Sequence, residues 1–139
     1  MKKVLYIFLI ALVIVSCKKT KFSPEGPTDI RVRNVQSTYT YTDVIVKSAG
    51  GKDTIGNIKN LGSIAPGQVS QYKRFAIAFY RAEISAKING ETFSTGPINS
   101  AYWTYIGPDK ITYEVYIKNL TSKLLEISAY IDEAPIDSL

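Results

Sequence analysis

Two-residue alternation of apolar and polar side chains runs through most of the chain after residue 27, and it restricts the fold to β-strands with one buried face. The pattern is clearest in residues 111–118 and recurs in residues 81–88 and 123–132. The side chains that we expect to face inward are Ile30, Val32, Val44, Val46, Ala82, Ile84, Ala86, Ile88, Ile111, Tyr113, Val115, Ile117, Leu125, Ile127, Ala129 and Ile131.

Turn residues separate these runs. Asn89-Gly90 supplies the two positive φ angles of a tight hairpin, and Gly50-Gly51 is suited to the same role. Pro66-Gly67 is typical of a type II turn, in which proline fixes the first central φ and glycine takes the left-handed second position. Residues 119–123 are short enough to join two antiparallel strands.

Seven to nine short strands with such turns predict an all-β fold. We expect an antiparallel β-sandwich of immunoglobulin-like type, because parallel strands covered on both faces would read as continuous apolar runs. A small barrel is the alternative architecture. Residues 71–80, with aromatic side chains at helical spacing, leave a short helix as a local alternative.

The first sixteen residues read as a targeting segment. Lys2 and Lys3 precede an apolar run at residues 4–15, which fits a signal peptide and is shorter than the roughly 20 residues that span a bilayer. We therefore expect a signal peptide at 1–16, a flexible tether at 17–27 and a single domain at 28–139.

The segment Ile14-Val15-Ser16-Cys17 resembles the lipobox of bacterial lipoproteins. The resemblance implies that Cys17 is lipidated and anchors the protein to a membrane of the cell envelope. Lys18 stands where inner-membrane retention signals place Asp, which favours the outer membrane. An ordinary secretory peptide or an uncleaved anchor are the alternatives. Residues 64–72 also look like a segment of small, uncharacterised envelope lipoproteins.

Charge and composition exclude several functions. The formal net charge is +5, but five lysines lie within residues 1–21, which leaves 12 basic and 12 acidic residues in residues 22–139. A neutral domain argues against nucleic-acid binding. The chain has no histidine, the commonest general base and transition-metal ligand, and Cys17 is its only cysteine. We expect no metal, cofactor or internal disulfide.

No motif points to catalysis. Ser70 and Lys73 match the Ser-x-x-Lys pattern of some acyl-transfer enzymes, but on a strand they face opposite sides, and the partner motifs of those families are missing. We therefore predict no catalytic residues and no enzyme activity. A small hydrolase is the function that the sequence supports least.

The aromatic group Tyr102, Trp103 and Tyr105 is the one candidate binding feature. Exposed aromatic rings beside a Gly-Pro loop stack on sugars or anchor protein partners, whereas a lone tryptophan in a small β domain usually packs into the core. We predict a non-catalytic lipoprotein that binds an envelope protein or has a structural role. A carbohydrate-binding module is the alternative.

Overall fold

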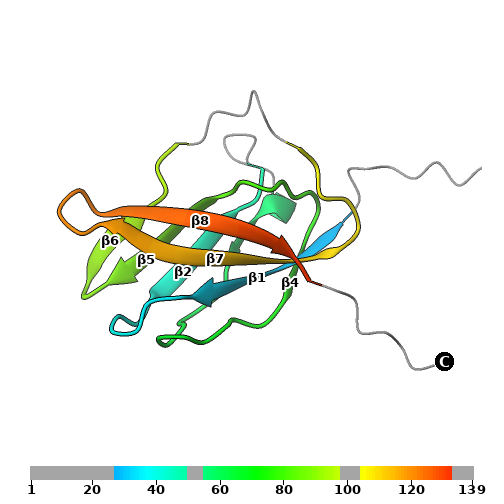
Figure 1. Ribbon diagram of the computed structural model, residues 1–139. Helices are drawn as coiled ribbons and strands as arrows, with labels where there is room; N and C mark the ends of the chain where they lie inside the picture. The colour runs from blue at the N-terminus through cyan, green and yellow to red at the C-terminus, as the bar shows by residue number, and fades with distance from the viewer. Residues whose placement is uncertain (1–26, 50–54, 98–103, 133–139) are drawn as a thin grey trace, which may run out of the picture.

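The computed structural model describes residues 27–49, 55–97 and 104–132 (Figure 1). Within these residues the all-β prediction is confirmed, with eight strands, one 3-10 turn (η1, Ile55–Asn57) and no α-helix. The strands are β1 (Thr28–Asn34), β2 (Thr42–Lys47), β3 (Ile58–Asn60), β4 (Lys73–Phe75), β5 (Glu83–Ile88), β6 (Glu91–Ser94), β7 (Lys110–Asn119) and β8 (Leu124–Ile131).

Several sequence predictions fall outside this part of the chain. The signal peptide, Cys17 and the tether up to residue 26 lie outside the described residues, as do Gly50-Gly51. The short helix considered at residues 71–80 is wrong, because the segment contains strand β4. In the described ranges, no helix is long and apolar enough to cross a bilayer.

The strands form one mixed sheet in the order β3-β2-β5-β6-β8-β7-β1-β4. The prediction of purely antiparallel pairing is wrong, because β1 and β7 are parallel, as are β6 and β8. Alternation requires only that one face of a strand be buried, which a parallel neighbour also allows. Because five strands separate β1 from β7 in the chain, no hairpin fixes their relative direction.

The core lies between two halves of the curled sheet. Figure 1 shows β8, β7 and β1 in front of β6, β5 and β2. Most side chains expected to face inward are buried, among them Ile84, Ile111 and Val115. Two core tyrosines bind backbone carbonyls across this space: the Tyr113 hydroxyl donates to Phe79, and Tyr41 donates to Val115 at 3.4 Å.

The predicted turns have the expected geometry where they are described. Asn89 and Gly90 have φ angles of 51° and 82° and join β5 to β6. Gly67 has a φ of 72°, and the Gln68 amide donates to the Ala65 carbonyl at 3.1 Å, which closes the turn at Pro66-Gly67. The β7–β8 hairpin is antiparallel, as the short connection predicts.

The sheet is nearly closed into a barrel, because its two terminal strands come together. Lys73 Nζ of β4 donates to the Asn60 carbonyl of β3 at 2.7 Å, and the Ala76 amide donates to Gly56 at 3.1 Å. Residues 61–70 complete the closure by bonding first to β2 and then to β1. We call residues 61–70, together with the strands β1 and β2 to which they bond, the closed seam.

Candidate functional site

Strand β8 has a complete partner on one side only. β7 pairs with it along its whole length, whereas β6 meets it at a single residue pair, Ser94 and Leu124. Among the residues that the structure describes, no strand pairs with the rest of β8 on the β6 side. We call this side of residues 126–131 the open edge. Unpaired N–H and C=O groups along a strand edge are a template for pairing with another chain.

The register shows which backbone groups point outward from the open edge. The Asp132 amide donates to the Lys110 carbonyl at 2.8 Å, so these residues face each other as a hydrogen-bonded pair. In an antiparallel ladder such pairs alternate with pairs whose backbone groups point away from the partner strand. Counted back from Asp132, the residues of the open edge whose backbone groups point away from β7 are Ile131, Ala129 and Ile127. Their N–H and C=O groups therefore point to the open edge.

The inner face of β8 becomes less covered along the same stretch. Leu125 is 2% exposed, Ile127 and Ala129 are partly buried, and Ile131 is 44% exposed although it faces inward. The prediction that Ile131 lies in the core is wrong, because no described strand covers it from the β6 side. The open edge therefore combines unpaired backbone with uncovered apolar side chains.

A cleft of about 280 Å³ lies where β8 separates from β6. Tyr80, Arg81 and Thr95 line it from the half of the sheet that contains β5 and β6, and Lys118 with residues 124–127 line it from the other half. Apolar and polar side chains both line the cleft, which suits one side chain of an extended segment whose backbone bonds to β8.

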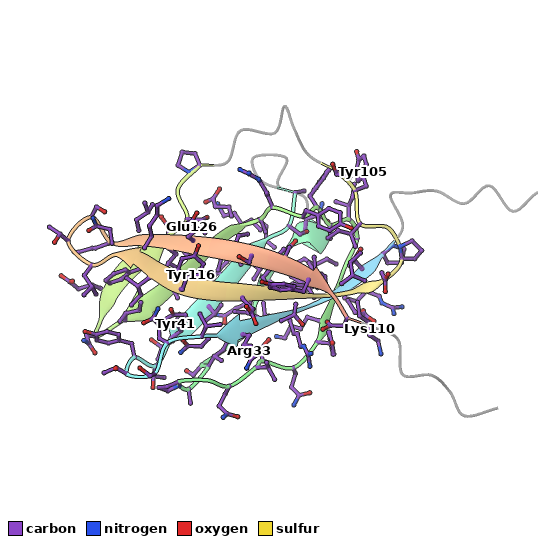
Figure 2. The ribbon with its side chains drawn as sticks, viewed as in Figure 1. Arg33, Tyr41, Tyr105, Lys110, Tyr116 and Glu126 are labelled. Carbon is purple, nitrogen blue, oxygen red and sulfur yellow. The ribbon has the colours of Figure 1, made fainter. Side chains whose placement is uncertain are left out.

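Charges at the rim of the cleft are partly paired. Lys118 Nζ lies 3.2 Å from Glu126 Oε2, and hydrogen bonds from Lys118 and then Tyr116 hold the pKa of Glu126 below its usual range. Burial and the neighbouring Glu126 raise the pKa of Tyr116. Figure 2 shows Tyr116 and Glu126 on the adjacent strands β7 and β8. Arg81 and Tyr80 are exposed on the opposite rim.

The cleft offers no activated nucleophile among its described residues. The Thr95 hydroxyl accepts a bond from the Ile84 amide at 3.1 Å and donates to the Gly96 carbonyl at 3.4 Å. Both partners are backbone groups, so no described side chain accepts the proton of this hydroxyl as a general base would.

A polar network fixes the far end of β8. Asp132 accepts hydrogen bonds from Tyr72 at 2.7 Å, Thr112 at 2.8 Å and Arg31 at 3.1 Å. Arg31 also donates to Thr112 at 2.8 Å, and its guanidinium carbon lies 4.8 Å from the centre of the Tyr72 ring. Burial, and next the Asp132 carboxylate, raise the pKa of Tyr72. The network ties β8 to β1 and β7, so the open edge is presented on a fixed strand.

Of the aromatic group that the sequence singled out, the structure places only Tyr105. Tyr102 and Trp103 lie outside the described residues. Tyr105, labelled in Figure 2, is 38% exposed. Its ring centre lies 4.5 Å from that of Phe79. The neighbouring Tyr80 is 40% exposed and also lines the cleft at the open edge.

The structure does not bring Ser70 and Lys73 together. Ser70 Oγ accepts a bond from the Val32 amide at 3.0 Å and donates to the Gln71 carbonyl at 3.0 Å. Lys73 Nζ donates to Asn60, as described above. In the described ranges, no group of three or more acidic or cysteine side chains could hold a metal ion.

Sequence reasoning missed the open edge. The alternation in residues 124–131 identified the face of each side chain, but a strand's neighbours depend on pairings distant in sequence. One available signal was the absence of proline and lysine from this stretch, since natural edge strands often carry these residues as protection.

No protein-family model matches the chain, and no curated protein sequence matches it. Among solved structures, the chain is similar to one described as the NMR structure of the protein from Eubacterium rectale. That similarity covers 88% of this chain and 100% of the other, with 13% sequence identity and a TM-score of 0.45. It gives no information about function.

Proposed function

We propose that this protein is a non-catalytic interaction module of the cell envelope, which accepts an extended segment of a partner protein on the open edge of β8. The observation that supports it is the single residue pair between β6 and β8, which leaves the edge-facing backbone groups of Ile127, Ala129 and Ile131 available. In β-strand addition, main-chain hydrogen bonds supply affinity and pockets for alternate side chains supply specificity.

The open edge lacks the usual protection against pairing. Residues 126–131 read Glu-Ile-Ser-Ala-Tyr-Ile, with one charge and no proline. The terminal strands β3 and β4 carry Lys59, Lys73 and Arg74, and basic side chains discourage edge-to-edge contact. This contrast supports β8, and not the ends of the sheet, as the site of strand addition.

The membrane anchor belongs to the same proposal. It rests on the lipobox resemblance, which implies a lipid at Cys17, and on Lys18, which favours the outer membrane. The ten residues 18–27 of the tether reach at most about 35 Å. We expect a Cys17→Ala variant to lose its lipid-dependent gel shift and to leave the detergent phase. Unlipidated, freely soluble wild-type protein would contradict the anchor without affecting the proposal for β8.

The finer fold assignment is also a proposal. The halves β3-β2-β5-β6 and β8-β7-β1-β4 correspond to the two layers of an immunoglobulin-like β-sandwich, and the single pair joining β6 to β8 supports this division. A solution structure with continuous hydrogen bonding between β6 and β8 would instead favour the barrel.

Site-specific photo-crosslinking in cells tests the binding proposal. A photoreactive amino acid at position 131 should form adducts with a partner, whereas the same amino acid at the exposed Thr38 should not. Ala129→Pro removes one edge-facing N–H and should abolish the adducts without unfolding the domain. Adducts of equal yield at both positions, or adducts that survive Ala129→Pro, would overturn the proposal.

Carbohydrate binding is the second candidate, supported by the exposed Tyr105 ring, which packs against Phe79 at an interplanar angle of 32°. Aromatic faces of this kind stack on sugar rings. Binding on a glycan array that is lost in Tyr105→Ala but kept in Ala129→Pro would favour this function over strand addition.

A further inference from the structure

We propose that the open edge of β8 pairs with the open edge of β8 in a second copy of this chain, in antiparallel orientation and centred on Ala129. The inference rests on the proposed function, because it names the partner of that same edge. In this arrangement Ile127 of one copy lies opposite Ile131 of the other, and the two Ala129 residues lie opposite each other.

The set of available backbone groups is symmetric about this centre. The N–H and C=O groups of Ile127, Ala129 and Ile131 point outward. On the N-terminal side, β6 already occupies the edge, since the Ser94 amide donates to Lys123 at 3.1 Å and Ser94 pairs with Leu124. A two-fold axis at Ala129 matches each outward group of one copy with an outward group of the other, as an isologous interface requires.

The apolar side chains on the inner face are complementary in the same register. Ile131 is 44% exposed, and in the pair it would pack against the partly buried Ile127 of the other copy. Small Ala129 side chains at the centre let the two backbones approach. Pairing would cover the part of the inner face that the described strands leave open.

The outer face adds one favourable contact and no unpaired charge. Tyr130, which is 53% exposed, would lie opposite Ser128 of the other copy. Glu126 would lie opposite Asp132, but each carboxylate already has a cation: Lys118 lies 3.2 Å from Glu126, and Arg31 lies 3.1 Å from Asp132. Each of the two carboxylates is therefore neutralised by a cation of its own copy.

Light scattering on the purified full chain, over a range of concentrations, tests the inference. The wild type should form a dimer, and Ala129→Pro should weaken it at least about tenfold, because the substitution removes two symmetric hydrogen bonds. Ile131→Lys places a charge on the inner face and should also give a monomer. Thr92→Lys, on an exposed part of β6, is the matched control and should leave the dimer intact.

Disulfide trapping tests the register. Ser128→Cys mixed with Tyr130→Cys should give a cross-linked dimer in higher yield than either variant alone, and wild type with only Cys17 should give none. Ser128→Cys that cross-links best with itself would overturn the centre at Ala129.

The two proposals fail differently. A wild type that is monomeric at every concentration overturns self-pairing, and photo-adducts with another protein at position 131 would still support strand addition. A dimer that persists in both Ala129→Pro and Ile131→Lys overturns the pairing of β8 strands.

Discussion

The strands of the closed seam and the strand of the open edge all alternate apolar and polar side chains, yet one edge is sealed and the other is not. At the closed seam the chain itself supplies the missing partner: Leu61 donates to Val44 at 2.7 Å, and Ser70 donates to Val32 at 2.8 Å. At the open edge, β6 leaves β8 after one residue pair. Whether an edge is left without a partner is therefore set by the path of the connecting segment.

The buried side chains differ in the same way. Tyr41 and Asn34 are fully buried at the closed seam, where Asn34 binds three backbone groups. At the open edge, by contrast, the large apolar side chain of Ile131 is 44% exposed. Substitutions at the closed seam should therefore lower the stability of the fold, whereas substitutions at the open edge should weaken binding.

The largest expected effect is the cost of Tyr41→Ala. Tyr41 is fully buried, and its backbone exchanges hydrogen bonds with Ile64 at 2.8 and 3.0 Å. Loss of a large buried aromatic side chain should lower the free energy of unfolding by about 3–5 kcal/mol. Ile131→Ala is the matched control at the open edge and should cost less than about 1 kcal/mol. Urea denaturation measures both, and equal losses would contradict the distinction between the two regions.

Asn34→Ala should have the next largest effect. The Asn34 amide nitrogen donates to the carbonyls of Tyr39 at 2.7 Å and Ile64 at 3.1 Å, and its oxygen accepts from the Gln36 amide at 3.0 Å. Leaving these groups without a partner should cost about 1–3 kcal/mol in urea denaturation. Asn34→Asp keeps the acceptor and loses the donors, so it should be as harmful. Asn119→Ala, on an exposed hairpin, is the control.

The strands could be predicted because their signals are local. Period-two alternation placed Ile84 and Tyr113 in the core, and Asn89-Gly90 fixed one hairpin. The parallel pairing of β1 with β7 could not be predicted, because it joins residues about eighty positions apart and no turn links them. Thr112 alternates with the inward-facing Ile111 and Tyr113 and so belongs to the outer face of the strand, yet it is buried, since Arg31 and Asp132 satisfy its hydroxyl.

The candidate site was harder to predict than the strands. It depends on a missing neighbour, which the sequence of β8 indicates only through the absence of proline and lysine from residues 126–131. The chain order only suggested that residues 124–131 pair with residues 111–118. Whether a strand pairs with the other edge of β8 depends on the direction in which β6 leaves β8. That direction depends on packing in the other half of the sheet. The single-domain prediction stays a prediction.

Alkaline pH should destabilise the fold through its buried tyrosines. Burial raises the pKa of Tyr113, whose hydroxyl donates to the Phe79 carbonyl. The folded state thus keeps a proton that the unfolded chain loses above about pH 10, so stability is fully present below that pH and falls as pH rises, by up to about 1.4 kcal/mol per pH unit. Tyr113→Phe removes this contribution. Its deficit in stability at pH 8 should therefore narrow at pH 11, and a constant deficit would contradict the assignment.

The smallest effect should come from the exposed ion pair that joins β1 to β4 beside the closed seam. Arg74 donates to both carboxylate oxygens of Asp29, at 2.8 and 2.9 Å, but the Arg74 side chain is 70% exposed. The hydrogen bond from Arg74 lowers the pKa of Asp29, so its stabilisation is present above about pH 4 and is lost as pH falls through the folded-state pKa. Asp29→Asn should cost less than about 1 kcal/mol at pH 7, and 1 M salt should remove most of that difference. A larger, salt-independent loss would mean that strand β4 needs this side chain to stay paired, and that the closed seam depends on it as well as on residues 61–70.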